Sequence, residues 1–200
     1  MIKNLSRRII GVTGGIATGK TTVTNYLATK YNFPVLDADL YAREAVAIGS
    51  PILTAIFIRY GDRLKLADGS LNRSALGEII FNNSDEKRWL ESQIHPFVRD
   101  RFNSESQNLH DKTLVYAIPL LFEANLTNLV TEIWVVYCDR AIQIERLQQR
   151  DGLSREQALA RIDARFPLAD KIERANIVLC NNTNRDFLLH QVDKAVKSSD

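Results

Sequence analysis

The chain has little of several features that mark specialised classes of protein. Its 200 residues contain only two cysteines, and no stretch approaches the roughly 18 uninterrupted apolar residues of a membrane span. Its 26 basic and 24 acidic residues give a net charge of +2, so composition gives no reason to invoke nucleic acid or a membrane as partner. Cys138 and Cys180 each end an apolar run, which predicts buried thiols in a reducing compartment rather than a disulfide framework.

The first residues, MIKNLSRRIIGVTGG, are also too short in apolar length for a signal peptide, and we expect a cytoplasmic protein. What the chain does have is an ordinary globular composition, with 45% hydrophobic and 25% charged residues. This composition and length predict one main domain with insertions. The sequence does not specify an oligomeric state.

Five short apolar runs predict strands. They cover residues 7–14, 33–39, 113–120, 132–138 and 176–181. Their apolarity is continuous rather than alternating, which is typical of strands buried on both faces. Helix-period segments follow the first and fourth runs, at residues 20–31 and 141–150. This βα rhythm predicts an α/β fold with a parallel five-stranded sheet covered by helices.

Two long segments depart from this simple rhythm. The second and third predicted strands lie about seventy residues apart, more than one crossover helix needs, and helical patterns in this gap predict an inserted subdomain over about residues 41–110. A segment over about residues 140–171 is rich in basic residues and poor in apolar ones, which suits a partly mobile lid over an anionic ligand. The core of the single domain is then expected at about residues 1–40, 111–139 and 172–200.

The stretch GGIATGKT, residues 14–21, matches the phosphate-loop pattern G-x-x-x-x-G-K-[ST] and lies between a predicted strand and a predicted helix, as that motif requires. Backbone N–H groups of such a loop converge on phosphate oxygens, and glycine permits the backbone angles and the close approach. We therefore predict nucleoside triphosphate binding. The expected ATP-binding residues are Gly14, Gly15, Ala17, Thr18, Gly19, Lys20, Thr21 and Thr22.

Within this loop, Lys20 should reach the β and γ phosphates, Thr21 should place its hydroxyl on Mg²⁺, and Thr22 should lie near the α phosphate. The alternative is a glycine turn with a surface lysine. The chain contains neither the D-x-x-G nor the N-K-x-D of GTPase switches. Its third apolar run ends AIPLLFE, without the terminal aspartate of a hydrolytic motor. A small-molecule kinase fits these observations best.

Asp37 and Asp39, in the sequence DAD, close the second predicted strand. Strand carboxyl ends are where an open α/β sheet binds ligands, and residues two apart on a strand share a face. One carboxylate could orient and deprotonate an acceptor hydroxyl while the other supports Mg²⁺ or a basic group. A helix N-cap is the alternative role for Asp39. Arg43, four residues further on, would be an ion-pair or phosphate partner if a helix begins there.

Six motifs carry a family resemblance. They are, in order, GVTGGIATGKTT, VLDADLYAR, GSPIL, LADGSLNRSALGEIIF, IHPFVR and IPLLFE. Together they resemble the dephospho-coenzyme A kinase family, and the likeness continues through the basic segment to ANIVLCNN. The resemblance implies a P-loop NTPase-type core, a helical substrate domain and an arginine-bearing lid. It further implies transfer of a phosphoryl group from MgATP to the ribose 3′-hydroxyl of dephospho-coenzyme A, the last step of coenzyme A synthesis.

The resemblance also implies roles for individual residues. Asp39 would be the general base, with Lys20 and Arg150 as the other catalytic residues. Arg146 and Arg150 are spaced to share a helical face, and Arg150 is the better match to the family's lid arginine. Lid arginines would neutralise the transferring phosphoryl group and exclude water. The weaker candidates are Arg155, Arg161 and Arg165.

The substrate-binding residues that the resemblance implies are Asp37, Asp39, Arg43, His95, Arg99 and Leu121. His95 and Arg99 belong to the IHPFVR motif, and Leu121 would shape the wall of the acceptor pocket. For His95, a helix-terminal polar residue without a ligand is the alternative. For Glu123, a lid or substrate contact and a structural ion pair both stay open.

The chain departs from the family pattern at two places. Ala17 and Thr18 replace a Gly-Ser pair, and the small alanine should be tolerated, whereas Arg165 stands where glutamine is usual. Asn181 follows the last predicted strand, where the family reads adenine through backbone and stacking contacts, so selectivity for the base stays open. Two other functions remain to be weighed: a kinase for another nucleoside or small alcohol, and an ATP-binding regulatory module without catalysis.

Overall fold

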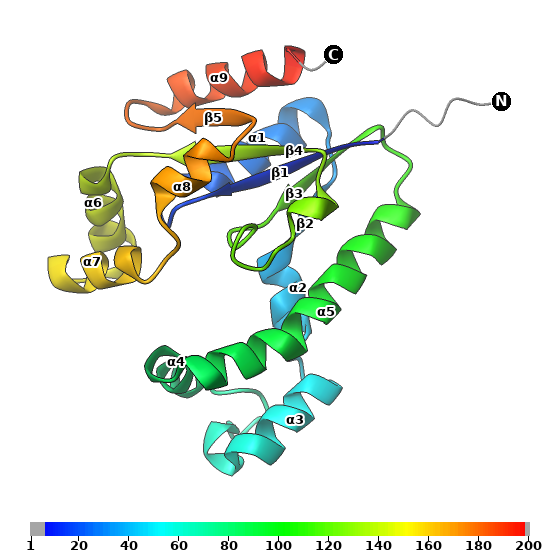
Figure 1. The fold of residues 1–200 in the computed structure, drawn as a ribbon, viewed down its shortest axis with the longest axis vertical. Coiled ribbons are helices and arrows are strands. Elements are labelled where there is room, and N and C mark those ends of the chain that lie inside the picture. The colour runs from blue at the N-terminus through cyan, green and yellow to red at the C-terminus, as the bar shows by residue number, and fades with distance from the viewer. Residues whose placement is uncertain (1–6, 199–200) are drawn as a thin grey trace. The chain divides into compact units, whose positions relative to one another are not determined.

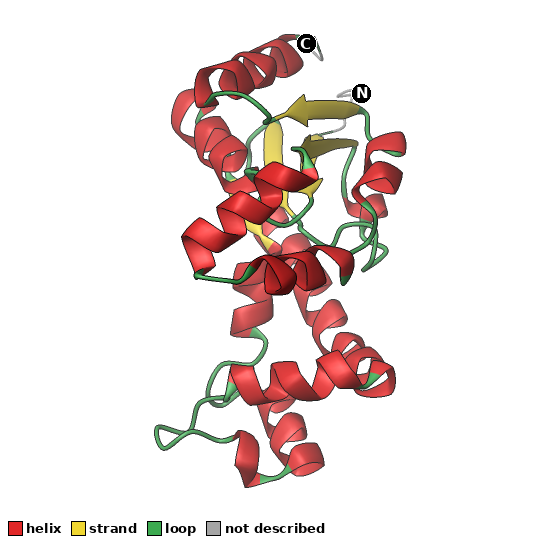
Figure 2. Ribbon diagram, turned by 90° about the vertical axis from the view of Figure 1, so that its left-hand side faces the viewer, coloured by secondary structure: helices red, strands yellow, loops and turns green. Residues whose placement is uncertain are grey.

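The computed structural model describes residues 7–198, which form two compact units (Figure 1). The first unit contains the chain up to Leu36 and from His110 onward, and the second covers Asp37–Leu109. Figure 2 shows strands in the first unit, whereas the second consists of helices and loops. Residues 1–6, the start of the segment judged too short for a signal peptide, lie outside the described part. Within that part, no helix combines the length and apolarity that crossing a membrane requires.

A five-stranded sheet of order β2-β3-β1-β4-β5 forms the centre of the first unit. Its strands are β1 (Arg8–Gly14), β2 (Val35–Asp37), β3 (Thr113–Ala117), β4 (Glu132–Tyr137) and β5 (Ile177–Cys180). β1 pairs in parallel with β3 and β4, and β4 pairs in parallel with β5. The predicted α/β fold with five strands is therefore confirmed.

Helices cover this sheet and complete the core. The helices of the first unit are α1 (Lys20–Tyr31), α6 (Arg140–Asp151), α7 (Arg155–Asp163), α8 (Leu168–Glu173) and α9 (Arg185–Lys197), with a short 3-10 turn η2 (Thr127–Leu129). Buried side chains of α1 and α9 pack with those of β1 and β4 in one apolar cluster, in which Trp134 is fully buried. Figure 1 shows α9 alongside β5. The helices predicted at residues 20–31 and 141–150 are confirmed as α1 and α6.

All five strands are shorter than predicted, β2 and β3 by the most, and one strand is less buried. β2 ends at Asp37 because a helix begins at Ala38, and β3 ends at Ala117, two residues before Pro119. β5 lies at the edge of the sheet, so Val178 is exposed and burial on both faces was wrong for this strand. For the same reason Cys180 is only partly buried, whereas Cys138 is buried as predicted; both thiols are free.

The second unit is a helical insert with its own core. Its elements are α2 (Ala38–Glu44), α3 (Pro51–Tyr60), a 3-10 turn η1 (Asp62–Leu64), α4 (Arg73–Asn82) and α5 (Ser84–Asn108). Side-chain caps fix where α3, α4 and α5 begin: Ser50, Asn72 and Asn83 each accept a hydrogen bond from a backbone N–H in the first turn. Tyr41 of α2 packs edge-on against Phe102 of α5, with ring centroids 5.1 Å apart. The helical patterns expected in the gap between the second and third predicted strands are confirmed as helices of this unit, α3 and α5 among them.

Candidate active site at the phosphate loop

Residues 15–19 connect β1 to α1, the strand-loop-helix context that the motif predicted. Gly14 has φ 149° and Gly19 has φ 102°, in a region that disfavours residues with a side chain. A Cβ atom at Gly14 would lie 2.1 Å from the carbonyl oxygen of Val136, and one at Gly19 would lie 2.3 Å from Nδ2 of Asn181. Both positions therefore require glycine for backbone angle and for space.

Three side chains from outside the loop bind its carbonyl oxygens. Gln143 donates from Nε2 to Ile16 (2.7 Å), Arg146 from Nη1 to Ala17 (3.2 Å) and Asn181 from Nδ2 to Thr18 (2.8 Å). In a trans peptide the C=O and the following N–H point in opposite directions. The N–H groups of Ala17, Thr18 and Gly19 therefore point away from these donors, as binding of an anion requires.

Ala17 adopts the left-handed conformation, with φ 58°. Its backbone carries strain of about 1 kcal/mol that glycine would not, and that it is tolerated because it is small stays a prediction. Thr18, the other departure from the family pattern, is fully buried and donates from Oγ1 to the carbonyl of Gly15 (3.1 Å). The side chain of Thr18 thus serves the loop itself.

Lys20 and Thr21 begin α1 directly after the loop. The Nζ atom of Lys20 donates to the carbonyls of Gly15 (2.5 Å) and Gly14 (3.4 Å), so its ammonium group lies against the loop. Thr21 is exposed in the first turn of α1. The loop thus has a cation and a hydroxyl at the positive end of one helix.

Two clefts border the loop. One, of about 310 Å³, is lined by Ala17, Gly19, Thr22, Arg146, Asn181, Thr183, Arg185 and Leu188. The other, of about 420 Å³, is lined on the side of the loop by Gly15 and Ile16, and opposite by residues of the basic segment, including Arg140, Gln143, Arg165 and Phe166. The loop therefore separates a cleft facing the start of α9 from a cleft facing the turn between α7 and α8.

The basic segment is less polar than predicted. Ile144, Leu147 and Ala158 are buried in a small apolar cluster, against which Ile16 and Ala17 of the phosphate loop also pack. The expectation of little apolar mass was therefore wrong, because one face of α6 packs against the loop. Sequence spacing placed Arg146 on a face with Arg150 but did not show that Arg146 lies under the loop.

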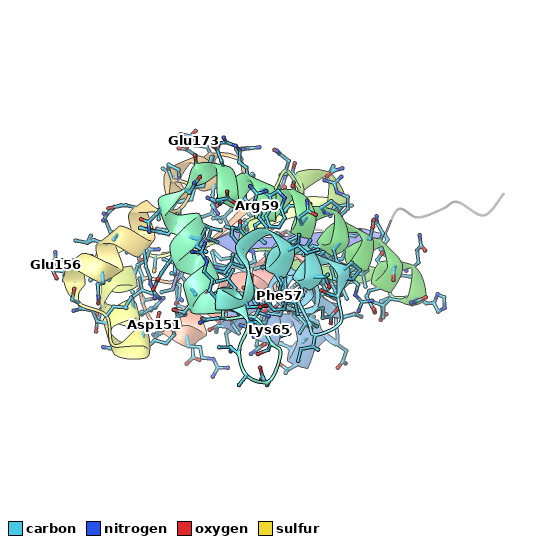
Figure 3. The ribbon with its side chains drawn as sticks, turned by 90° about the horizontal axis from the view of Figure 1, so that it is seen from below. Phe57, Arg59, Lys65, Asp151, Glu156 and Glu173 are labelled. Atoms are coloured by element: carbon cyan, nitrogen blue, oxygen red, sulfur yellow. The ribbon has the colours of Figure 1, made fainter. Side chains whose placement is uncertain are left out.

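Arg150 is held at the end of α6 by its neighbour Asp151, which is labelled in Figure 3. Its Nε and Nη2 atoms donate to the two carboxylate oxygens at 2.8 and 2.9 Å. The hydrogen bonds of this pair raise the pKa of Arg150 and lower the pKa of Asp151. Arg161 reaches the same carboxylate at 3.3 Å, and Arg140 pairs with Asp163 at 2.7 Å.

The DAD sequence does not end a strand in the way predicted. Asp37 is the N-cap of α2 and accepts from the backbone N–H of Asp39 at 2.8 Å, so Asp39 lies in the first helical turn. Placing both carboxylates on one strand face was wrong, and so was an N-cap role for Asp39. Arg43 lies in the last turn of α2, on the face of Asp39, and both residues are exposed.

His95 and Arg99 lie one turn apart inside α5, so the helix-terminal alternative for His95 was wrong. Burial lowers the pKa of His95; Arg99 lowers it further and Glu91 opposes this. Pro96 lies inside the helix and has no N–H to donate to the preceding turn. A cleft of about 440 Å³ in this unit is lined by Arg63, Leu64, Ala75, Glu78, Ile79 and Asn82, none of which was predicted to bind substrate.

The segment after β3 contains Leu121 and Glu123. Leu121 is completely buried in the first unit, so it presents no surface to a ligand in this conformation. Glu123 forms an ion pair with Lys171 at 2.8 Å, which is the structural alternative for this residue. Gln143, Asn181 and Lys171 are the residues of this region that sequence reasoning missed or left without a role. The only signal of these residues in the sequence is that their side chains are polar. That they are buried becomes visible only in the fold.

The fold and the phosphate loop define a P-loop kinase. A shikimate kinase from Acinetobacter baumannii shares this fold, with a TM-score of 0.57, 16% identity and coverage of 96% of this chain and 95% of that one. A Thermus thermophilus protein matches with a TM-score of 0.85 and 33% identity (96% and 97% covered). Dephospho-CoA kinase from Campylobacter jejuni matches with a TM-score of 0.71 and 29% identity (95% and 96% covered).

The sequence comparisons narrow this class to one family. The family profile described as dephospho-CoA kinase matches residues 8–186. The dephospho-CoA kinase of Nostoc sp. is 55% identical over 192 residues, covering 96% of this chain and 98% of the relative. That of Synechocystis sp. is 56% identical over 190 residues, covering 94% of each. The chain belongs to the dephospho-CoA kinase family.

Proposed function

We infer that this protein transfers the γ-phosphoryl group of ATP to the ribose 3′-hydroxyl of dephospho-coenzyme A, giving coenzyme A and ADP. The observation that carries this conclusion is the match to the family along almost the full chain, at up to 56% identity with relatives of that name. The phosphate loop between β1 and α1 supports ATP as the donor. We further propose that the enzyme works in the cytoplasm without a nucleic-acid partner.

For the donor side, we propose that the loop from Gly14 to Thr22 holds the phosphates of ATP. The N–H groups that point away from the buried donors, with the ammonium of Lys20, would neutralise their charge. The exposed hydroxyl of Thr21 fits a Mg²⁺ ion, because Mg²⁺ keeps most of its waters and needs few protein ligands. Bound there, the ion would neutralise charge that develops on the phosphate oxygens.

For the acceptor side, we propose Asp39 as the general base. Asp37 caps α2 through the N–H of Asp39, which fixes the backbone from which Asp39 projects. Asp39 is exposed, so an acceptor hydroxyl has access to its carboxylate. An exposed carboxylate on a fixed backbone, as at Asp39, suits a group that orients a hydroxyl and accepts its proton.

The remaining assignments concern substrate and lid. We propose that the helical insert binds dephospho-coenzyme A, with Asp37, Arg43, His95 and Arg99 as contacts, and that residues 140–171 act as the lid. Leu121 would contact substrate only after the loop around it moves, since it is completely buried. Arg150 would leave Asp151 to reach the transferring phosphoryl group, and Arg161 is already placed to keep Asp151 paired.

The experiment is a coupled assay of the purified protein with MgATP and dephospho-coenzyme A, following ADP and coenzyme A together. Stoichiometric formation of both products is the expected result, and neither product across a range of pH would refute the proposal. A panel of other nucleosides and small alcohols tests for a different acceptor. ATP binding without any transfer would indicate a regulatory module instead.

A further inference from the structure

Lys171 is a lysine whose charge lies inside the protein. It belongs to α8, at the end of the basic segment, and only 2% of its surface is exposed. Its Nζ atom donates to Oε1 of Glu123 at 2.8 Å and to the carbonyl oxygen of Pro119 at 3.1 Å. An ammonium group is seldom buried unless it is paired and hydrogen-bonded, and here both conditions are met.

The carbonyl of Pro119 links this lysine to the phosphate loop. Thr13, which is fully buried in β1, donates from Oγ1 to the same oxygen at 3.2 Å. Thr13 directly precedes Gly14, the first residue of the loop motif. One carbonyl oxygen therefore accepts hydrogen bonds both from the residue before the loop and from α8.

Apolar contacts hold the same two segments together. The rings of Phe122 and Phe166 stack with centroids 6.4 Å apart, and the guanidinium of Arg174 lies 4.4 Å from the centroid of Phe122. Residues from the end of α7, the turn after it and the start of α8 line the cleft of about 420 Å³ together with Gly15 and Ile16. The basic segment is thus fixed at its end by Lys171 while the residues just before it face the phosphate loop.

Stability alone does not explain this pair. A buried ion pair is commonly no more stabilising than well-packed apolar side chains of similar volume. Oε2 of Glu123 is buried without a hydrogen-bond partner among the described residues, which adds to the cost. Unlike contacts between apolar side chains, the hydrogen bonds of Lys171 are directional. The two bonds fix the position of α8 relative to Pro119 and Glu123.

We propose that Lys171 is a positioning residue for phosphoryl transfer. It anchors the end of the segment at residues 140–171 to the loop after β3, so that this segment closes over the phosphate loop in one geometry. The proposal rests on the proposed kinase function. It assigns to Lys171 an effect on turnover rather than on ATP binding, since neither Lys171 nor Glu123 lines the cleft of about 310 Å³ beside α9.

The test compares Lys171→Met with the double variant Lys171→Met/Glu123→Leu, which replaces the ion pair by apolar side chains. We expect the single variant to lose stability to urea and the double variant to regain it. In the double variant kcat should still fall by about 100-fold while KM for ATP changes by less than about threefold, because misplacement impairs transfer more than binding. Lys30→Met, which removes an exposed lysine paired with Asp193 in the same unit, is the matched control and should keep kcat.

A second measurement separates this proposal from the kinase function. Hydrogen exchange with a non-hydrolysable ATP analogue should show protection of residues 155–170 in the wild type and markedly less in the double variant. Wild-type protection or wild-type kcat in a stable double variant would overturn the positioning role. If the double variant does not fold, Glu123→Gln takes its place, because glutamine still offers Lys171 an acceptor oxygen. In this variant residues 155–170 should also be less protected than in the wild type, by a smaller amount. If the wild type makes no coenzyme A, the kinase function fails, while the exchange result still decides the role of Lys171.

Discussion

Asn181 donates a hydrogen bond from Nδ2 to the carbonyl oxygen of Thr18 at 2.8 Å, and so joins the end of β5 to the middle of the phosphate loop. Asn181 is 8% exposed, and its own carbonyl accepts from Nη2 of Arg146 at 3.1 Å. The residue therefore connects the loop, the last strand and α6. It also lines the cleft of about 310 Å³ beside α9.

Asn181→Ala should weaken ATP binding. The substitution removes the shorter of the two hydrogen bonds to the carbonyl of Thr18 and leaves only the 3.5 Å bond from Arg146. This loss costs about 1–3 kcal/mol in the loop and corresponds to about a 5- to 150-fold rise in the dissociation constant for ATP. Titration calorimetry measures this change. Asn25→Ala, at an exposed position of α1, is the control and should bind ATP like the wild type. Equal affinity of both variants would show that the loop keeps its conformation without Asn181.

Ala17→Gly should stabilise the protein. Glycine adopts φ 58° without the strain that Cβ causes, and we expect about 1 kcal/mol more free energy of unfolding, part of it offset by the greater freedom of the unfolded chain. Urea denaturation measures the difference. Ala160→Gly, at an exposed position of α7, is a control of opposite sign and should destabilise by about 1 kcal/mol. A loss of stability in both variants would contradict strain at Ala17.

Asp39→Asn should lower kcat by about 100- to 10,000-fold with ATP binding unchanged, because the base is lost and the phosphate contacts remain. Asp37→Asn separates this effect from helix capping, since asparagine caps a helix as well as aspartate does. We expect Asp37→Asn to keep the stability of the wild type and most of its kcat. Steady-state kinetics with both substrates measures both variants. Near-normal turnover of Asp39→Asn with a large loss in Asp37→Asn would transfer the role of base to Asp37.

Glu86 should make the helical insert sensitive to acid. Hydrogen bonds from Arg59, labelled in Figure 3, and from Tyr60 lower the pKa of Glu86 to about 2 from its ordinary 4.5. Between these values the unfolded chain binds the proton more readily, so the contribution of Glu86 is present above pH 4.5 and is lost as the pH falls towards 2.

Glu86→Gln tests this directly. Its destabilisation, measured by urea denaturation, should be largest at neutral pH and should shrink between pH 4.5 and pH 3, where the wild type loses the same contribution. Glu91→Gln, at a more exposed carboxylate whose lysine partner lies 3.9 Å away, is the control and should show a much smaller dependence on pH. A constant difference between wild type and Glu86→Gln at all pH values would contradict the lowered pKa.

The sequence predicted those features that local patterns encode. Continuous apolar runs predicted the buried strands, and Gly14, Gly19 and Lys20 predicted the phosphate loop, because their spacing reflects backbone geometry that few other sequences satisfy. It failed at Asp37 and Asp39, since the side chain of Asp37 accepts a hydrogen bond from the backbone N–H of Asp39 and so starts a helix two residues earlier than apolarity suggests.

Other misses came from packing between segments far apart in the chain. The spacing of Arg146 and Arg150 predicts only that the two side chains share a helical face. In the structure only Arg146 contacts the phosphate loop, at Thr18, 128 residues away in sequence. The burial of Leu121 and Lys171 also depends on which segments fold against them. Such facts are tertiary, and a single sequence carries no direct signal of them.

The bonds from Gln143, Arg146 and Asn181 to the loop carbonyls bear on how the protein recognises its nucleotide. These bonds form within the chain itself, so the conformational entropy of the loop is given up during folding and not when ATP arrives. In the proposed site, the nucleotide would meet a loop whose N–H donors are already held in place. Its affinity would then be set mainly by desolvation and electrostatic attraction, and mutations in two distant segments, α6 and the end of β5, could change it without touching a phosphate.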